Sequence, residues 1–322
     1  LQVYEDGLQV RISFPDASPY FVDSGEEVEV IVNSIGSEML HLYVDGALVA
    51  GTTGYHLTHV VTASTQPNTK TRIKAVAVSG SEMVCDSTYF FERGATLVED
   101  LPEGVRDGIN YIDDNTVTLV LLAPYKSSVY VHGKFNGWEI GPEYKMKRNT
   151  ESADDPWARY WVTISDLNPE EEYPFQYIID EVLYLADPYA EKILDEGNDP
   201  YISDAVYPGL IDYPSGKTTG IVSVLQTAQS EYDWQHDEFN KPKNTELVIY
   251  EMLVRDFNEE HTYAAIADTL DYLQQLGVNV LELMPVNDFE GNSSWGYNPS
   301  FYFAPDKYYG PKDQLKRLID EC

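Results

Sequence analysis

The chain has 322 residues and a formal net charge of −33, from 21 basic and 54 acidic side chains. This acidity disfavours nucleic acid and anionic membrane surfaces as partners, because phosphate groups are bound by Lys and Arg, whereas a neutral ligand such as a sugar is compatible with it. The length predicts two to three domains, and no apolar run approaches the roughly 18 residues that a membrane-spanning helix needs.

The two cysteines, Cys85 and Cys322, fall in different predicted domains, and we do not expect them to pair. Two cysteines provide neither a disulfide framework nor a zinc site. We predict no metal and no cofactor for this chain. The chain begins at Leu1 without Met or an apolar leader, so we expect a processed or trimmed product from which any targeting signal has been removed.

Residues 1–96 read as an all-β domain, because short segments alternate apolar and polar residues at period two. A further segment, Leu42–Val49, contains the Asp45-Gly46 pair that is typical of a tight hairpin turn. Short strands separated by Gly and Ser predict an immunoglobulin-like β-sandwich, with a spacer or docking role. The alternating segments are Leu8–Phe14, Val28–Val32 and Thr71–Val78.

An acidic stretch without period, Gly94–Asp107, reads as a linker, and a second all-β domain is predicted over residues 107–190. One strand of this domain is followed directly by the hexapeptide GKFNGW, Gly133–Trp138. A tight turn is predicted after the last strand, at Asp180-Glu181. The strands are predicted at Thr116–Leu122, Ser128–His132, Arg159–Ile164 and Tyr173–Ile179.

The hexapeptide Gly133–Trp138, together with Phe175–Asp180 and Ala186–Ala190, resembles carbohydrate-binding module family 48, a starch-binding-like sandwich. The resemblance implies that Trp138 caps the turn. An exposed Trp can stack on a sugar face, which makes Trp138 a candidate for glycan binding. Trp138 and Trp161 also lie in or beside alternating strands, where an aromatic side chain is usually part of the core. Both roles stay open for Trp138.

Residues 191–245 have weak periodicity and are punctuated by Pro200, Pro208 and Pro214. Because their many aromatic side chains would be costly to leave in water, we expect an ordered connecting segment between domains. Gly220–Leu225 is a candidate for one more strand.

Residues 246–322 show the pattern of a parallel α/β sheet or barrel: a strand, a helix, a second strand, a long aromatic loop and a second helix. The first strand, Leu247–Val254, is apolar apart from Glu251, which predicts burial on both faces. Functional side chains of such folds lie at the carboxyl ends of strands, so the loop after the second strand is where a substrate is expected. The other elements are a helix over Tyr263–Leu276 with Gly277 at its C-cap, a strand over Val278–Met284 and a helix over Pro311–Glu321.

Four motifs of this last segment, in order and at natural spacing, resemble the opening of the catalytic barrel of glycoside hydrolase family 13, the α-amylase family. Tyr250-Glu251 with Arg255-Asp256-Phe257 is similar to the family's first strand and following loop. Leu276–Val286 is similar to its L-G-V-x-x-I-x-L-x-P-V pattern. The remaining matches are Trp295–Pro299 with Phe303–Pro305, and Tyr309–Asp313.

The two resemblances together imply a multidomain fold of two all-β sandwiches followed by the first two β/α units of a TIM (β/α)8 barrel. Tyr297 matches the tyrosine that stacks on the sugar at the cleavage point, although it could also serve only to pack the loop. Trp295, Asn298 and Asn287 are weaker candidates, for contacts with sugar hydroxyl groups or for bracing the loop. The substrate-binding candidates are therefore Tyr297, Asn298, Trp295, Asn287 and Trp138.

The resemblance supplies no catalytic residue. Retaining glycosidic cleavage needs a carboxylate nucleophile and a carboxylic acid on opposite sides of the bond. In the resembling family these two groups and a third, assisting Asp follow the fourth, fifth and seventh strands, and none of Asp256, Asp288 or Glu290 matches those positions. We expect the chain itself to be inactive. Calcium is compatible with a longer parent enzyme, as in many family members, but no ligands for it are identified here.

These expectations describe the N-terminal portion of an α-glucan-active enzyme that acts on α-1,4 or α-1,6 glucosidic bonds of starch, glycogen or pullulan by a retaining mechanism. The expected partner is an α-glucan polysaccharide or oligosaccharide, and the incomplete barrel is expected to self-associate through its unpaired edges. An appended immunoglobulin-like domain favours an extracytoplasmic location. The rival interpretations are a branching or transglycosylating enzyme, a non-catalytic starch- or glycogen-binding protein, and a structural interaction protein.

Overall fold

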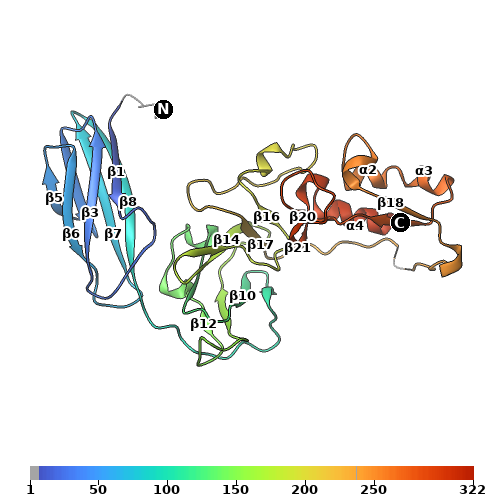
Figure 1. Cartoon of the computed structure of the whole chain (residues 1–322), viewed down its shortest axis with the longest axis horizontal. Helices are drawn as coiled ribbons and strands as arrows, with labels where there is room; N and C mark the ends of the chain where they lie inside the picture. The colour runs from blue at the N-terminus through green and yellow to red at the C-terminus, as the bar shows by residue number, and fades with distance from the viewer. Residues whose placement is uncertain (1–6, 237) are drawn as a thin grey trace. The chain divides into compact units, whose positions relative to one another are not determined.

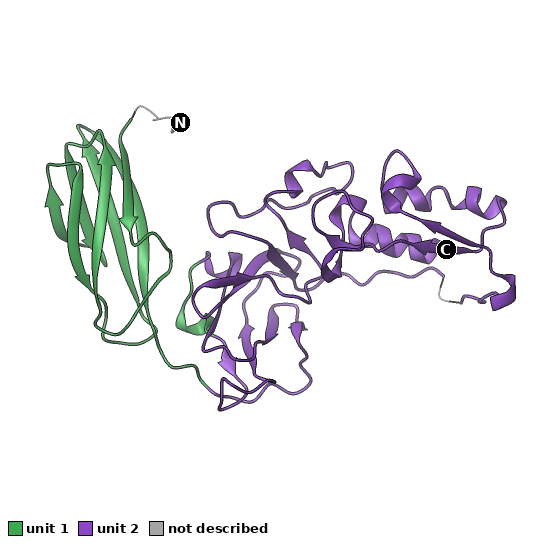
Figure 2. Ribbon diagram, viewed as in Figure 1, with its two compact units in different colours: residues 1–97, 139–145 green, residues 98–138, 146–322 purple. Residues whose placement is uncertain are grey.

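A computed structural model of the chain describes residues 7–236 and 238–322 and consists mainly of β-sheets (Figure 1). It divides into two compact units. The first comprises residues 1–97 and 139–145, and the second comprises residues 98–138 and 146–322 (Figure 2).

The first unit contains a three-stranded sheet in the order β1-β3-β6 and a five-stranded sheet in the order β2-β8-β7-β4-β5. All pairs are antiparallel except β2 with β8. The hairpin predicted at Asp45-Gly46 is confirmed, and both residues have the positive φ that its turn requires, 47° and 82°. The strands are β1 Gln9–Phe14, β2 Tyr20–Val22, β3 Glu27–Ile35, β4 Met39–Val44, β5 Ala47–Thr52, β6 His56–Thr62, β7 Lys70–Ser79 and β8 Glu82–Glu92.

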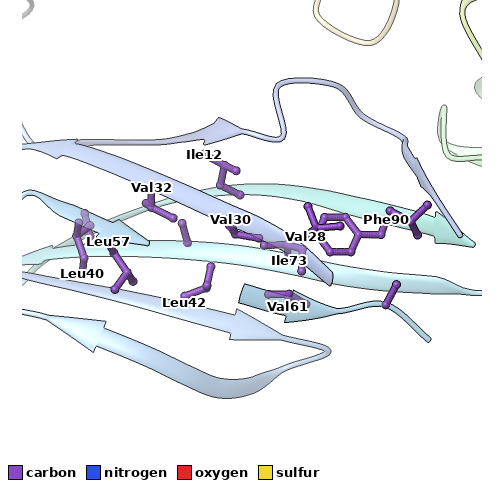
Figure 3. Close-up of a cluster of buried hydrophobic side chains, with 14 of the residues drawn as sticks. Ile12, Val28, Val30, Val32, Leu40, Leu42, Leu57, Val61, Ile73 and Phe90 are labelled. Atoms are coloured by element: carbon purple, nitrogen blue, oxygen red, sulfur yellow. The ribbon is translucent and has the colours of Figure 1, made fainter. Parts of the chain in front are cut away.

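The core of this unit follows from the predicted alternation. Val28, Val30 and Val32 are buried on one face of β3, while the residues between them are more exposed. Side chains from the two sheets meet in the interior, where Leu42 and Phe90 have no solvent exposure (Figure 3). Unit 1 thus has an apolar core of its own.

Residues 139–145 belong to the first unit, although they fall within the predicted second sandwich. Ile140 is fully buried, and its amide donates to the hydroxyl of Tyr89 at 3.0 Å. Beside it, Lys70 Nζ lies 2.9 Å from Glu139 Oε2, and this contact holds the pKa of Glu139 below its usual range. The segment that follows Trp138 is therefore a packed part of unit 1.

The second unit begins with two further sheets, one in the order β12-β13-β10-β9 and one in the order β11-β14-β17-β16, with β15 paired to β14. The strands predicted in this region are confirmed. Asp180 and Glu181 have φ of 47° and 67°, as expected for the tight turn between β14 and β15. The strands are β9 Gly108–Asp113, β10 Thr116–Leu122, β11 Val129–Gly133, β12 Lys147–Arg148, β13 Arg159–Ile164, β14 Glu172–Ile179, β15 Leu183–Leu185, β16 Ile193–Leu194 and β17 Val222–Gln226.

The predicted connecting segment takes part in this β structure. β17, the strand proposed near Gly220–Leu225, pairs antiparallel with both β14 and β16. Ser223 within it is fully buried, and its hydroxyl accepts a hydrogen bond from the amide of Asp187 at 2.6 Å. Residues of the connecting segment therefore complete the sheet of β11, β14, β17 and β16.

The last part of the chain contains β18 Ile249–Met252 and β19 Val280–Leu283, which pair in parallel as the β/α pattern predicts. In the described part of the chain these two strands form a two-stranded sheet and do not close into a barrel. The helices are α1 Val254–Phe257, α2 Tyr263–Ala267, α3 Leu270–Gln275 and α4 Lys312–Glu321.

The single helix predicted over Tyr263–Leu276 is wrong in one respect, because it is broken into α2 and α3. At the break, the hydroxyl of Thr269 donates to the carbonyl oxygen of Ala265, and Thr269 has φ −108° and ψ 2°. A Thr side chain that bonds to its own backbone in this way competes with the regular helix. The C-cap of α3 is Leu276, one residue before the predicted Gly277, and Gly277 follows it with the left-handed φ of 84°.

Two further expectations for this segment need correction. Burial of the first strand on both faces is wrong: Ile249 is 54% exposed and Tyr250 is 39% exposed, because β19 is the strand that flanks β18 in the described residues. The long aromatic loop also contains regular structure. β20 Asn287–Phe289 pairs antiparallel with β21 Pro299–Pro305, and a short 3₁₀ helix, Lys307–Tyr309, follows.

Cys85 and Cys322 are free and exposed. Across residues 7–236 and 238–322, no helix combines the length and apolar character needed to span a bilayer. Within the same ranges, His, Cys, Asp and Glu side chains form no group of three or more suited to hold a metal ion.

Candidate functional site

The candidate site lies where β18 and β19 end. Because the two strands are parallel and in register, with Met252 opposite Leu283, the segments that follow them emerge at the same edge of the sheet. Arg255 and Asp256 follow β18, and the β20–β21 hairpin follows β19. The site is therefore built from one short helix and one hairpin-containing loop.

Gly296 sets the path of the loop. Its φ is +86°, and a Cβ atom on it would lie 2.1 Å from the carbonyl oxygen of Pro285, just after β19. Only glycine permits both the left-handed backbone and this close approach. The segment Trp295-Gly296-Tyr297 is consequently pressed against the end of the strand, with a large aromatic residue on each side of the glycine.

Both of these aromatic side chains are open to solvent. Trp295 is 64% exposed and Tyr297 is 66% exposed. Two exposed aromatic rings on one tightly turned loop offer flat apolar surfaces of the kind that stack on the faces of ring-shaped ligands. Of the aromatic residues predicted from sequence, these two are exposed, whereas Trp138 is partly buried.

The two predicted asparagines are engaged inside the loop. Asn298 Oδ1 accepts a hydrogen bond from the hydroxyl of Ser294, which also accepts from the amide of Gly296 at 3.0 Å. Asn287 Nδ2 donates to the carbonyl oxygen of Tyr302 at 2.6 Å across the hairpin. These bonds favour the bracing role over direct contact with a ligand for both residues.

Arg255 joins the two segments at the strand ends. Its Nη1 donates to Ser293 Oγ at 3.1 Å and to the Ser294 carbonyl oxygen at 3.4 Å, so it holds the loop after β19. Its Nε and Nη2 donate to the two carboxylate oxygens of Asp256 at 2.7 and 3.0 Å. The guanidinium keeps the pKa of Asp256 below its usual value, and Asp256 therefore stays ionised and paired.

A buried charge cluster underlies the hairpin, and sequence reasoning missed it. Lys307 Nζ lies 3.2 Å from Asp199 Oδ1 and 3.3 Å from Asp288 Oδ2, and all three side chains are less than a tenth exposed. Asp199 comes from the connecting segment, whereas Asp288 and Lys307 come from the loop after β19. A lysine in such an interior must be paired, so the cluster fixes the loop to the connecting segment.

Asp306 adds a third carboxylate beside this lysine. Its oxygens accept hydrogen bonds from the amides of Tyr308 at 2.8 Å and Phe289 at 3.3 Å. Burial, together with the charge of Asp288, raises the pKa of Asp306 to about 7. Burial would lower the pKa of Lys307, but the surrounding carboxylates outweigh burial and raise it above its usual value. No sequence signal reveals this cluster, because Asp199 lies far along the chain from Asp288, Asp306 and Lys307.

Trp138 lies outside this site. It is partly buried and packs against the apolar cluster of Leu194, Val222 and Val224, with its ring centre 5.2 Å from that of His132. Its amide donates to the Gly133 carbonyl oxygen at 2.8 Å, which closes the hexapeptide turn as predicted. Burial lowers the pKa of His132 to about 4, so the imidazole beside Trp138 is neutral near pH 7. This packing favours a core role for Trp138.

No family model matches the chain. Malto-oligosyltrehalose trehalohydrolase of Saccharolobus solfataricus is 27% identical to it over 211 residues, which cover 66% of this chain and 31% of that enzyme. The 1,4-alpha-glucan branching enzyme GlgB 2 of Clostridium perfringens is 28% identical over 235 residues, which cover 66% of this chain and 31% of that enzyme. The chain thus spans about a third of the length of these curated relatives.

Among solved structures, the GBS pullulanase SAP in complex with maltotetraose has a similar fold. The similarity covers 97% of this chain and 44% of the pullulanase, with a TM-score of 0.50 and 18% sequence identity. At this identity the comparison concerns the fold alone.

Proposed function

Because the homologues of this chain are glycoside hydrolase family 13 enzymes that match about two thirds of it, we propose that the chain is the N-terminal portion of an α-glucan-active enzyme. The parent enzyme acts on α-1,4 or α-1,6 glucosidic bonds of starch, glycogen or pullulan with retention of configuration. In the chain as given, the role of the last segment is to contact the glucan.

The fold proposed with this function is an immunoglobulin-like sandwich over residues 1–96, a starch-binding-like sandwich over residues 107–190 and the first two β/α units of a TIM barrel over residues 246–322. The parallel pairing of β18 with β19, with α2 and α3 between them in sequence and α4 after them, supports the barrel assignment. The appended first sandwich supports an extracytoplasmic location, which fractionation of the source cells and immunoblotting would test.

The observation that carries the proposal is that Trp295 and Tyr297, on either side of Gly296, are both exposed. Their rings are presented at the carboxyl end of a parallel strand, where barrel enzymes bind their substrates. We assign Tyr297 to stacking on a glucose ring, because a flat aromatic surface holds a sugar ring by its apolar face. The hydrogen bonds of Arg255 and the buried ion pairs of Lys307 with Asp199 and Asp288 hold this loop in position.

We further propose that this chain does not hydrolyse glucan by itself. Retaining hydrolysis needs two carboxyl groups about 5–5.5 Å apart, one of them able to donate a proton. Asp256 is held ionised by Arg255, and Asp288 is buried against Lys307. Neither is free to protonate a leaving group, which supports inactivity.

The test is calorimetric titration of the whole chain with maltoheptaose, together with an assay of reducing ends. We expect saturable binding without new reducing ends, and binding at the loop weakened about tenfold in Tyr297→Ala. Tyr302→Ala is the matched control, because Tyr302 is 69% exposed on the same hairpin and is expected to leave the affinity unchanged. Equal affinity of all three proteins would contradict the assignment of Tyr297, and new reducing ends would contradict inactivity.

The similarity to a branching enzyme supports a second candidate reaction for the parent, transfer of a glucan segment instead of hydrolysis. The two reactions differ in their products, because hydrolysis creates one reducing end for each bond cleaved and transfer leaves their number constant. Counting reducing ends with an enzyme that carries the complete barrel therefore separates them. A third candidate, a non-catalytic starch-binding protein, predicts the same binding by this chain and no turnover in any longer form.

A further inference from the structure

Two exposed aromatic residues outside the candidate site lie on loops of the second sandwich. Tyr125, in the loop between β10 and β11, is 65% exposed, and Trp157, in the loop between β12 and β13, is 64% exposed. In contrast to Trp157, its near neighbours in the sequence Tyr160 and Trp161 are buried in the core. The rings of Tyr125 and Trp157 therefore do not contribute to the packing of the sandwich.

The two loops are joined by their backbones. The amide of Ala123 donates to the carbonyl oxygen of Ala158 at 3.0 Å. The amide of Tyr125 donates to the carbonyl oxygen of Ala153 at 2.8 Å. Tyr125 has φ +63°, a left-handed conformation that a tyrosine seldom adopts and that its surroundings must hold in place. The two aromatic residues consequently emerge from one hydrogen-bonded loop pair.

The loop that carries Trp157 is held from within by two arginines. Arg148 donates to the carbonyl oxygens of Thr150 at 2.8 Å and Glu151 at 2.7 Å. Arg159, which is paired with Asp107 at 2.6 Å, donates to the carbonyl oxygen of Trp157 at 3.3 Å. An exposed ring on a braced backbone loses little conformational freedom when it binds a ligand, which is the property of a preorganised contact site.

The surroundings of Trp157 limit the class of ligand. Glu151 and Asp154 are exposed on the same loop, and the whole chain carries a net charge of −33. Phosphate-rich ligands and anionic membranes are repelled by such a surface. A neutral sugar chain fits it, because sugar rings have apolar faces for the aromatic side chains and hydroxyl groups that donate to carboxylates.

We propose that Tyr125 and Trp157 form a second glucan-contact site on this chain, separate from the loop of Trp295 and Tyr297. The inference rests on the proposed function, since it takes the ligand to be the same α-glucan. The second site lets the protein bind a glucan polymer at a place other than the barrel segment. Two contact sites on one chain raise the apparent affinity for a long glucan above that for a short one.

The test is calorimetric titration of the whole chain with maltoheptaose, read as the number of sites. We expect two sites per chain, falling to one in Trp157→Ala with the affinity of the remaining site unchanged. In Tyr297→Ala we expect both sites to remain, with the loop site about tenfold weaker and the second site unchanged. Tyr125→Ala is expected to weaken the second site about tenfold. Trp157→Phe keeps an aromatic ring and is expected to retain the site.

Tyr55→Ala is the matched control, because Tyr55 is 66% exposed on the first unit and has no role in the proposal. Since all of these side chains are exposed, the variants should unfold within a few degrees of the unmodified chain. Binding by the unmodified chain that persists with the same stoichiometry in Trp157→Ala would overturn the second site alone. Absence of any maltoheptaose binding would instead overturn the proposed function and the second site together.

Discussion

The first sandwich and the last segment of the chain differ in how completely they bury their apolar side chains. In the first unit, Val30 of β3 and Leu42 of β4 are fully buried between two sheets of three and five strands. In the last segment, β18 and β19 have each other as partners, and the apolar Ile249 remains 54% exposed. The interior of the last segment also contains the charged Lys307.

The difference shows what an apolar pattern in a sequence can predict. Alternation at period two predicted the buried face of β3 correctly, because the facing sheet comes from the same stretch of chain. The mainly apolar segment Leu247–Val254 is typical of a strand covered on both faces, and in the described residues that cover is incomplete. The last segment accordingly depends on ion pairs and tight turns.

The largest effect is expected from Lys307→Met. Removing the ammonium group leaves the buried carboxylates of Asp199 and Asp288 without their partner, which we expect to destabilise the second unit by about 3–5 kcal/mol. Urea unfolding followed by tryptophan fluorescence measures the loss. The control is Lys243→Met, because Lys243 forms an exposed pair with Glu246 at 3.5 Å and such pairs contribute at most about 1 kcal/mol. Equal small losses in both variants would show that the buried cluster is not a structural anchor.

Gly296→Ala is expected to have the next largest effect, about 2–4 kcal/mol, because it combines a left-handed backbone with a Cβ atom placed 2.1 Å from the Pro285 carbonyl oxygen. Gly277→Ala is its matched control. Gly277 has nearly the same φ, +84°, but no atom lies within 4 Å of its added Cβ, so we expect about 1–2 kcal/mol. Urea unfolding compares the two variants, and similar losses would rule out the close approach as the cause.

Opposite pH dependences are expected from two buried groups of the second sandwich. His132 has a folded-state pKa of about 4, below its unfolded value, so its neutral form is stable in the fold and its contribution is lost as pH falls from 6.5 towards 4. Asp187 has a pKa raised to about 6 by burial, so folding binds a proton there and stability increases as pH falls from 6 towards 4. Each slope is at most about 1.4 kcal/mol per pH unit.

The two slopes are separated by substitution. His132→Gln should remove the loss of stability towards low pH, and Asp187→Asn should make that loss steeper. The measurement is the free energy of unfolding in urea at several pH values between 4 and 7. Parallel profiles for the unmodified chain and both variants would show that neither group titrates differently in the fold.

The smallest expected effect concerns self-association through the exposed face of the last segment. Light scattering should give a mass above the 36.5 kDa of one chain, increasing with concentration. Ile249→Thr should weaken the association about tenfold, because burial of an isoleucine side chain contributes about 1.5–3 kcal/mol. Leu48→Thr is the control, since Leu48 is 58% exposed on a strand of the first unit. A single monomeric mass at all concentrations would contradict the prediction.

How much of this structure the sequence predicts depends on the range of the interactions. The bounds of β10 and β13 were predicted correctly because their alternation is local. β8 was missed, since Asp86, Ser87 and Thr88 interrupt its apolar pattern and pairing with β7 decides the strand.

The candidate site divides in the same way. Trp295 and Tyr297 were found through a motif of neighbouring residues, and the structure presents both rings to solvent. The ion pair of Lys307 with Asp199 joins residues that are far apart in the sequence. The residues that neighbour Lys307 in the sequence do not indicate that it is buried or which carboxylate it pairs with. The pair Tyr125 and Trp157 was missed for a related reason, because solvent exposure of an aromatic residue is set by the packing of the loops around it.

The most direct test of the central claim, that this chain recognises α-glucan through exposed aromatic residues without cleaving it, is electrophoresis of the native chain through a gel that contains soluble starch. We expect the chain to be retarded relative to a starch-free gel, with less retardation for Tyr297→Ala and least for the variant that combines Tyr297→Ala with Trp157→Ala. Unchanged mobility of the unmodified chain in starch, or cleared starch along its path, would contradict the account.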